Sequence, residues 1–451
     1  MDNPEQQKKY ERMTTEPVSR LVGRLAVPTV ISMLVTALYN IADTFFVGQI
    51  GPSATGAIGV SYSLMALVQA VGFGFGHGSG NYISRKLGER NVHEAAVMVT
   101  VGFVTSFLAG LVIMIAGLPN MAQLAMLLGS TPTIRPYAEE YMLFILLGVP
   151  FFASSLTLNN QLRLQGAAGK AMVGITAGAV VNFLLDPLFI FGMDMGVSGA
   201  GLATMVSQVL SFFLLIWLNR RGDTVSLNLS LFRPTKERYV AILQGGVPSS
   251  GRQGVHCLSN IMMNHAMKLF GDNFFAAMII VVRLSNLIFA ITAGIGQGFQ
   301  PVCGFNYGAR RFDRVRAAYF YTQKLSLFFL LLFTIILFVF APQVVSLFSD
   351  VDEVIALGVH IQRWQCVSIP FMGFCIIIGM LLQNINKYKQ ATLMALSRSG
   401  IFFIPAILLL PWLFGMTGVI IAQPVSDLCS FFLALPIRRK VLGELKADMT
   451  A

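Results

Sequence analysis

The sequence has few charged residues. Asp, Glu, Lys and Arg make up 12% of its 451 residues, whereas soluble domains carry about 25%. Hydrophobic residues account for 55% of the chain, and its mean hydropathy is +0.69. So few charges cannot cover the surface of a water-soluble protein of this size. The composition therefore argues against a soluble enzyme, a nucleic-acid-binding protein and a disordered protein.

Motifs for metal, nucleotide or nucleophilic chemistry are also scarce. The five cysteines include no C-x-x-C pair, so we expect them to be buried packing residues. The glycine run at 72–80 lies inside a hydrophobic stretch, where small residues favour close helix packing over phosphate binding. His77 within that run is expected to be a packing residue rather than a proton carrier. We therefore expect no enzymatic activity, no nucleic-acid partner and no cofactor.

Twelve stretches are long and apolar enough to cross a membrane as helices, which requires about 20 residues each. They lack the alternating pattern of transmembrane β-strands. The sequence therefore predicts an all-α integral membrane protein with about 12 transmembrane helices. Their approximate limits are 22–48, 58–84, 94–117, 134–158, 170–192, 196–219, 241–269, 275–300, 315–341, 357–383, 391–413 and 416–437.

The basic residues predict how these helices cross the membrane. Cytoplasmic loops are enriched in Lys and Arg. If both termini are cytoplasmic, the inner segments hold most of the 32 basic residues, and the outer segments hold only Arg135, Lys268 and Arg363. We therefore expect a multi-pass protein of the inner cell membrane, with both termini in the cytoplasm.

The two halves of the sequence are copies of each other at an offset close to 220. Examples are Pro28 and Pro248, Asn40 and Asn260, Gly76 and Gly296, Pro150 and Pro370, and Ser207 and Ser426. Six helices per copy give both copies the same orientation, as in parallel transporter repeats. We predict two six-helix bundles, at 1–219 and 241–451, joined by a cytoplasmic linker at 220–240. A pseudo-two-fold axis along the membrane normal would relate them, and this arrangement suits alternating access.

Two carboxylates lie inside predicted spans of the first half, where ionisable groups are costly and usually functional. Asp43 and Asp186 are each five or six residues before the outer end of a span, so we expect them at one depth. Asn182 shares a helix face with Asp186. Tyr39, Tyr141 and Thr204 reach a similar depth.

These oxygen-bearing side chains have the chemistry of a site for a small cation. Carboxylate, amide and hydroxyl oxygens bind hard cations, and two close carboxylates can also share a proton. We therefore predict a coupling site for Na⁺ or H⁺, with Asp43, Asn182, Asp186 and Thr204 as the candidate Na⁺ ligands. Pro28 interrupts the hydrogen bonding of the first span and is the predicted hinge.

The second half has no equivalent acid pair. Met263 stands where Asp43 would repeat, and Ile404 stands near the position equivalent to Asp186. Arg252, Arg283 and Arg398 are present instead, with Asp427 at mid-depth in the last span. We expect Asp427 to pair with one of these arginines. The substrate cavity is assigned to Met33, Asn159, Gln208 and Arg283.

This pattern resembles the multidrug and toxic compound extrusion (MATE) family. The resemblance rests on Pro28, on Asp43 in A-D-T-F-F-V-G, on Asn182 and Asp186 in N-F-L-L-D-P, and on the paired loop motifs G-E-R-N and G-A-R-R. It is closest to the branch with its coupling carboxylates in the N-terminal lobe. The resemblance implies a cation site at Asp43, Asn182, Asp186 and Thr204, with Tyr39 and Tyr141 nearby. It also implies export of organic, often cationic, drugs in exchange for Na⁺ or H⁺.

Other functions stay open at this stage. A flippase for a lipid-linked or other amphiphilic substrate would need a cationic cavity, which Arg252, Arg283 and Arg398 could supply. An integral-membrane enzyme is the least favoured reading, since no catalytic motif is present. We expect the protein to be a monomer whose partners are amphiphilic cationic drugs and membrane lipid.

Overall fold

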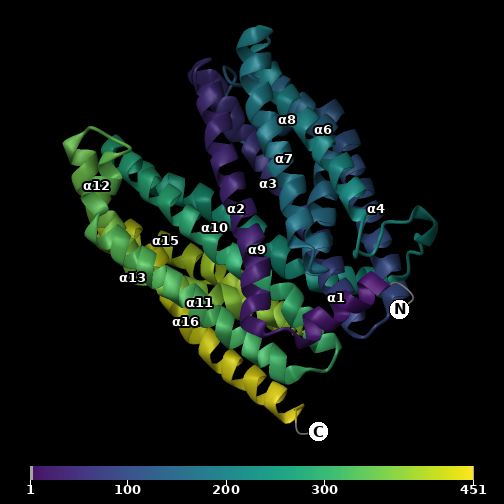
Figure 1. Cartoon of the computed structure of the whole chain (residues 1–451). Helices are drawn as coiled ribbons and strands as arrows, with labels where there is room; N and C mark the ends of the chain where they lie inside the picture. The colour runs from purple at the N-terminus through teal and green to yellow at the C-terminus, as the bar shows by residue number, and fades with distance from the viewer. Residues whose placement is uncertain (1–3, 450–451) are drawn as a thin grey trace. The chain divides into compact units, whose positions relative to one another are not determined.

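The computed structural model describes residues 4–449, except for the side chains of residues 39–44 and 52. Within that part of the chain every regular element is a helix (Figure 1). The elements of the first half are α1 (Pro4–Thr15), α2 (Val18–Gly48), α3 (Pro52–Gly88), α4 (Val92–Gly117), η1 (Leu118–Asn120), α5 (Met121–Leu127), α6 (Arg135–Leu164), α7 (Ala168–Pro187), η2 (Leu188–Gly192), α8 (Gly196–Asn219) and η3 (Leu229–Leu231).

The second half repeats this order of long helices. Its elements are α9 (Lys236–Lys268), α10 (Asp272–Gly308), α11 (Phe312–Val339), α12 (Ala341–Ser346), α13 (Asp352–Asn384), α14 (Tyr388–Leu396), η4 (Ser397–Ile401), α15 (Phe403–Phe414) and α16 (Met416–Ala447). Each of the twelve predicted spans coincides with a long helix or with a helix interrupted by a short π-helical turn. The all-α prediction is therefore confirmed for the described residues.

Eleven helices in the described part of the chain are long and apolar enough to span a membrane. The predicted span at 241–269 forms a helix of 33 residues, α9, but is not among the eleven. Its sequence is more polar than the others because it carries Arg252, Gln253, His256 and Asn260. Helix length therefore supports a twelfth span here, whereas hydropathy does not.

Several short elements lie outside the predicted spans. α1 is a polar helix before the first span, and α5 and α12 follow the fourth and eleventh helices of the chain in equivalent places of the two halves. Hydropathy alone does not mark them because they are short or polar. The π-helical turn η2 extends the end of α7, which carries Asp186, and η4 carries Arg398 between α14 and α15.

The helices group into two compact units by their contacts. One unit contains residues 4–16 and Ile31–Gln253, and the other contains Pro17–Val30 and 254–449. The first part of α2 thus packs with the second unit, and the first part of α9 packs with the first unit. This grouping concerns packing, and the predicted limits 1–219, 220–240 and 241–451, which rest on the sequence repeat, stay a prediction.

Glycines of α3 form a close helix seam inside the first unit. Gly72, Gly76 and Gly80 face α6, where a Cβ atom would come within 2.5–2.8 Å of Leu156, Asn160 or Leu164. Gly74 and Gly78 face α9, and a Cβ on Gly78 would overlap the carbonyl oxygen of Ile242. The prediction that this glycine run serves close helix packing is therefore confirmed.

The second unit contains an equivalent seam between α10 and the first part of α2. A Cβ on Gly294 would lie 2.6 Å from Val30 Cα, and one on Gly298 would lie 2.5 Å from Ala26 Cα. The Thr29 hydroxyl also donates a hydrogen bond to the Gly294 carbonyl at 2.7 Å. Gly294 and Gly298 are the repeat counterparts of Gly74 and Gly78, so the repeat preserves a backbone-to-backbone contact in each unit.

Candidate cation site

Asn182, Asp186 and Thr204 meet in the interior of the first unit. Each is at most 1% exposed. In the orientation of the Asn182 amide that satisfies both neighbours, its nitrogen donates to Asp186 Oδ2 at 2.9 Å and its oxygen accepts from the Thr204 backbone N–H at 3.2 Å. In the other orientation the amide nitrogen donates to Thr204 Oγ1 at 3.3 Å. The structure therefore brings three of the predicted site residues together.

Small residues let α7 and α8 approach closely enough to form this cluster. A Cβ on Gly174 would overlap Leu215, and one on Gly178 would overlap the Ser211 hydroxyl. The Ser211 hydroxyl donates to the Gly174 carbonyl at 3.1 Å. These contacts lie one to two turns before Asn182, so the glycines fix the separation of the two helices that carry the polar side chains.

The end of α7 also shapes the surroundings of Asp186. Pro187 follows it directly, and the chain continues into the π-helical turn η2. Proline has no backbone N–H, so regular α-helical hydrogen bonding cannot continue through this position. π-helical turns are frequent at functional sites, because they change the direction in which nearby side chains project.

The Asp43 and Tyr39 side chains lie outside the described residues. Neighbouring side chains nevertheless place the outer part of α2 beside α7: the ring of Phe46 lies 5.5 Å from the ring of Phe183, centroid to centroid. Phe183 is adjacent in sequence to Asn182. The pairing of Asp43 with Asp186 therefore stays a prediction. The helices that carry these two acids contact each other at Phe46 and Phe183, three residues from each acid.

Tyr141 is buried at 1% exposure in the core of the first unit. Its backbone carbonyl oxygen would lie 3.0 Å from a Cβ on Gly201, which is less than one turn from Thr204 on α8. Tyr141 therefore lies on the side of α8 next to the cluster. Its role in the site stays a prediction.

The predicted cavity residues come from both units. Gln208 is buried one turn after Thr204, with its Oε1 atom close to Gly148. Asn159 is buried near the start of α7 and donates to the Ala171 carbonyl at 2.7 Å. Met33 is partly buried on α2, and Arg283 is exposed on α10 of the second unit. Their role as cavity residues stays a prediction.

The hinge candidate Pro28 lies two residues before the point where α2 passes from one unit to the other. Before that point α2 is tied to α10 through Thr29 and the glycine seam. After it α2 packs with the first unit. In α9 the equivalent Pro248 precedes the change of unit, which follows Gln253.

In the second unit Asp427 pairs with Arg398, as predicted. Arg398 Nε lies 2.6 Å from Asp427 Oδ1, and Gln423 Nε2 donates to the same oxygen at 2.9 Å. Arg252 belongs to the first unit, whereas Arg283 and Arg398 belong to the second.

Sequence reasoning missed the partner of His77. Arg163, buried at the end of α6, contacts His77 Nε2 at 3.1 Å, and His77 Nδ1 contacts the Phe73 carbonyl at 3.1 Å. Because the carbonyl requires a donor at Nδ1, Nε2 is left to accept from the guanidinium, as in a neutral imidazole. This contact fits a packing histidine.

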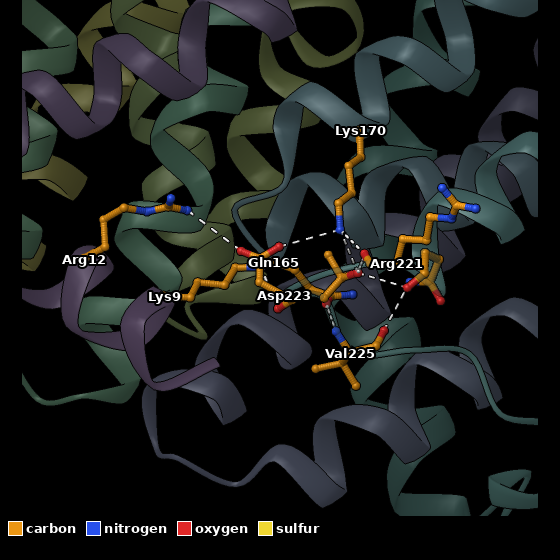
Figure 2. A network of polar contacts seen from close by, with 9 residues as sticks. Lys9, Arg12, Gln165, Lys170, Arg221, Asp223 and Val225 are labelled. Atoms are coloured by element: carbon orange, nitrogen blue, oxygen red, sulfur yellow. Dashed lines mark hydrogen bonds and ion pairs between the residues drawn. The ribbon is translucent and has the colours of Figure 1, made fainter. Parts of the chain in front are cut away.

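A second missed feature is a charged network between α1 and the segment after α8 (Figure 2). Asp223 lies 3.3 Å from Lys9 Nζ, 3.6 Å from Lys170 Nζ and 4.0 Å from Arg12. Burial lowers the pKa of Lys9 to about 8, although Asp223 opposes the shift. Burial alone would raise the pKa of Asp223, but Lys9 and Lys170 outweigh it and lower that pKa.

The same segment is held by amides of the first unit. Gln165 Oε1 accepts from the Val225 N–H at 2.7 Å, and Asn219 Oδ1 accepts from the Leu227 N–H at 2.6 Å. The predicted linker therefore begins as an ordered part of the first unit. Asp223 could have been singled out from sequence because it directly follows Arg220, Arg221 and Gly222.

Within the described residues no three His, Cys, Asp or Glu side chains gather as a metal site. The cluster at Asp186 instead has one carboxylate with amide and hydroxyl groups. These groups can accommodate a proton on the carboxylate, and their oxygens are of the type that binds Na⁺.

Comparison with known proteins agrees with this architecture. A sequence model of the MatE family matches residues 28–188 and 254–408. The chain is 27% identical to a multidrug export protein MepA of Staphylococcus haemolyticus over 433 residues, which covers 96% of this chain and 95% of that protein. In 54 curated proteins the similarity is significant.

Solved MATE structures have the same fold. One structure in a straight conformation superposes with a TM-score of 0.90 at 26% identity, covering 98% of this chain and 99% of that one. Another in a bent conformation gives 0.91 at 24% identity over the whole of both chains. These transporters have the two-lobe fold of twelve helices predicted above. The chain is a multi-pass membrane protein and belongs to the MatE family of transporters.

Proposed function

We propose that this protein is a cation-coupled antiporter that exports organic drugs. The observation that carries the proposal is the buried carboxylate of Asp186, which accepts a hydrogen bond from the Asn182 amide beside Thr204. A carboxylate inside a membrane protein is costly and usually functional. The multidrug export protein MepA, to which the chain is similar along its length, supports drugs as the exported substrates.

The coupling step is neutralisation of the buried acid by a cation from outside. A proton would bond to an Asp186 oxygen, and the Asn182 amide would keep its contact with Thr204. Na⁺ would need oxygen ligands, so the amide would turn its nitrogen to Thr204 Oγ1 and its oxygen toward the ion. The two orientations of the amide thus suit the two ions, and we propose Asp43 as the second carboxylate of the site.

The proposed movement is a bend of α2 near Pro28. The segment before Ile31 is held by Gly294 and Gly298 in the second unit, whereas the rest of α2 packs with the first. A charge change at the outer part of α2 would then be transmitted to a helix whose two parts belong to different units. This arrangement supports transport by alternating access.

A cationic substrate competes with the coupling ion for the same negative charge. By thermodynamic reciprocity, substrate and ion must weaken each other's binding by the same factor. We propose Met33, Asn159, Gln208 and Arg283 as substrate-cavity residues, with Tyr39 and Tyr141 near the ion. We further propose a location in the inner cell membrane, with both termini in the cytoplasm and a monomer as the working form.

A flippase is the second candidate. It would require a cationic cavity for phosphate groups. Arg398 is paired with Asp427, which reduces the net positive charge available to a phosphate group, so this pair does not favour it. The antiporter is therefore the function that the geometry supports best.

The test is transport in vesicles reconstituted with purified protein. A fluorescent cationic dye is loaded, and Na⁺ and pH gradients are imposed separately. The proposal expects dye movement driven by at least one gradient and lost in Asp186→Asn. Asp194→Asn, an acid in the exposed loop after η2, is the matched control and should transport like the unaltered protein.

Two outcomes would contradict the proposal. Gradient-driven dye transport by Asp186→Asn at the unaltered rate would remove the carboxylate from the mechanism. Lipid scrambling without any gradient, together with no dye movement, would favour the flippase.

A further inference from the structure

The second unit contains a cavity of about 90 Å³ that the coupling mechanism does not use. Its walls come from α9, α10, α13, α15 and α16 and from the π-helical turn η4, all within that unit. Arg398, Asp427 and Gln423 line it together with further polar residues of α9, α10 and α13, among them His256, Asn286 and Gln365. Its apolar lining residues include Met263, Met278, Met372 and Phe289. Convergent polar groups beside apolar side chains are typical of small-molecule sites.

The positive member of the ion pair is the one that faces the open space. The Arg398 side chain is 19% exposed, whereas that of Asp427 is 2% exposed. Asp427 Oδ1 already accepts hydrogen bonds from Arg398 Nε and Gln423 Nε2. In the part of the chain that the structure describes, neither terminal nitrogen of the Arg398 guanidinium takes part in a hydrogen bond. The cavity therefore offers donors from a cation rather than an accessible carboxylate.

The backbone around Arg398 is held in place by hydroxyl groups of two other helices. The π-helical turn η4 leaves carbonyls outside the usual α-helical pattern. Ser426 of α16 donates to the Arg398 carbonyl, and Ser259 of α9 donates to the Ser399 carbonyl. Side chains fixed by such contacts are pre-organised for binding, which lowers the entropic cost of holding a ligand.

The apolar side of the cavity can adapt to different shapes. Methionine side chains are flexible and polarisable, and they make favourable contacts with aromatic rings. The Arg398 guanidinium carbon also lies 6.0 Å from the centre of the Phe289 ring, which leaves the ring near the charged group. An aromatic ligand would therefore contact methionine and phenylalanine while its polar end reaches Arg398.

The size of the cavity limits what it can hold. Drug-sized ligands occupy pockets of about 300–1,000 Å³, and an engineered apolar cavity of about 150 Å³ binds one benzene. A volume of about 90 Å³ therefore suits a single aromatic ring that the cavity encloses only in part. Guanidinium matches the planar geometry of a carboxylate with paired hydrogen bonds.

We propose that this cavity binds a single-ring aromatic carboxylate, or the same group at the end of a larger amphiphile, and that Arg398 recognises its carboxylate. That such a ligand is an exported substrate rests on the proposed function, but its binding in the cavity does not. A ligand cation is disfavoured because Asp427 is buried behind Arg398 and Gln423. Asp427 competes with the ligand carboxylate for the guanidinium and so sets the affinity.

The experiment uses 4-azidobenzoate as a photoreactive probe of the purified full-length protein in detergent. Labelled peptides are mapped by mass spectrometry, and benzoate, benzamide and benzyltrimethylammonium are added as competitors. The proposal expects labelling on α10 and α13 around Met278 and Met372. Benzoate should compete at concentrations about tenfold lower than benzamide, because its bond to guanidinium is charge-assisted.

Variants separate recognition from folding. Arg398→Gln alone would leave a buried unpaired acid, so the combined variant Arg398→Gln with Asp427→Asn is used and should lose the preference for benzoate. Asp427→Asn alone removes the competing carboxylate and should let benzoate compete at lower concentration than in the unaltered protein. Arg363→Gln, an exposed arginine of α13 outside the cavity, is the matched control.

Equal competition by benzoate and benzamide, or stronger competition by the ammonium compound, would overturn the proposal. Labelling is also repeated in Asp186→Asn. If the protein fails to export under any gradient while labelling follows the pattern above, the proposed function fails and the cavity assignment stands. If export is normal and benzoate is not preferred, only the cavity assignment fails.

Discussion

In the first unit the buried acid Asp186 accepts a hydrogen bond from the Asn182 amide, whereas in the second unit the buried acid Asp427 accepts one from the Arg398 guanidinium. Each unit also has a seam in which glycines contact the backbone of a neighbouring helix. An acid among neutral groups can gain and lose a proton or a cation. An acid that is paired with arginine has an opposite charge beside it. On the proposed antiport mechanism, the partner of the buried acid distinguishes the unit that couples to an ion.

The sequence repeat shows that the buried acids of the two halves occupy positions that do not correspond. Ser207 aligns with Ser426, so Gln208 occupies the place of Asp427. Thr204 and Asn182 have no acid or base at their counterparts in the second half. The two units therefore place their buried acids on different helices, α7 in the first and α16 in the second.

The largest expected effect compares the two acids directly. Asp186→Asn should reduce gradient-driven export of a cationic dye by about 100-fold or more, because an interaction lost from a coupled step removes several kcal/mol. Asp427→Asn should keep most of that export. Initial rates in reconstituted vesicles measure both. Equal losses in the two variants would remove the distinction between the units.

The glycine seams should respond alike in both units. Gly78→Ala and Gly298→Ala each place a methyl group against backbone atoms, and such overpacking costs about 1–3 kcal/mol. Thermal unfolding of the purified variants measures this cost. A Cβ on Gly23 or Gly254 would meet nothing within 4 Å, so Gly23→Ala and Gly254→Ala are the controls. Full stability of one seam variant alone would show that the units do not share this feature.

A smaller effect concerns α1, whose ion pairs with Asp223 lie within the first unit. Asp223→Asn leaves the buried Lys9 without its closest counter-charge and should loosen α1 by about 1–3 kcal/mol. Lys9→Met removes the buried charge itself and should cost less, because Asp223 keeps Lys170 and Arg12. Hydrogen exchange of the α1 amides measures the difference. Greater loosening by Lys9→Met would contradict the assigned role of burial.

The smallest effect is a pH dependence of the same contact. The pKa of Lys9 is about 8 when α1 is docked, and its ordinary value is 10.5. The undocked state therefore binds more protons between these values, and docking becomes more favourable as pH rises through that window. Between pH 8 and 9 the gain is about 1 kcal/mol. Hydrogen exchange at pH 7 and 9 should show it, and Lys9→Met should lack it. Looser docking at pH 9 would contradict the sign.

Much of the fold could be predicted from the sequence because apolar length and basic loops are direct physical signals of membrane helices. The small residues at 72–80 also predicted close helix packing, and the pairing of Asp427 with an arginine followed from the cost of a lone buried charge. The span at 241–269 was predicted from its length and apolar content, and the structure forms helix α9 there although its hydropathy is lower than that of the other spans. By contrast, α1 has no apolar run, and its anchoring depends on a contact with Asp223 more than 200 residues away.

The candidate site was predictable in part. Asn182 and Asp186 share a helix face, so their proximity follows from helix geometry, and Thr204 required the depth argument. The cavity residues were not predictable in this way. The depth of Arg283 or Asn159 in the membrane does not determine on which face of its helix the side chain lies. The contact of Arg163 with His77 was missed because the two residues lie on different helices with no pattern linking them.

The most direct test of the account is the linkage between substrate and coupling ion at Asp186. The dissociation constant of a cationic dye is measured on purified protein over a series of pH values and Na⁺ concentrations, in the unaltered protein and in Asp186→Asn. The account predicts that binding of the dye to the unaltered protein weakens as H⁺ or Na⁺ rises, and that Asp186→Asn loses this dependence. The same dependence in both proteins would contradict it.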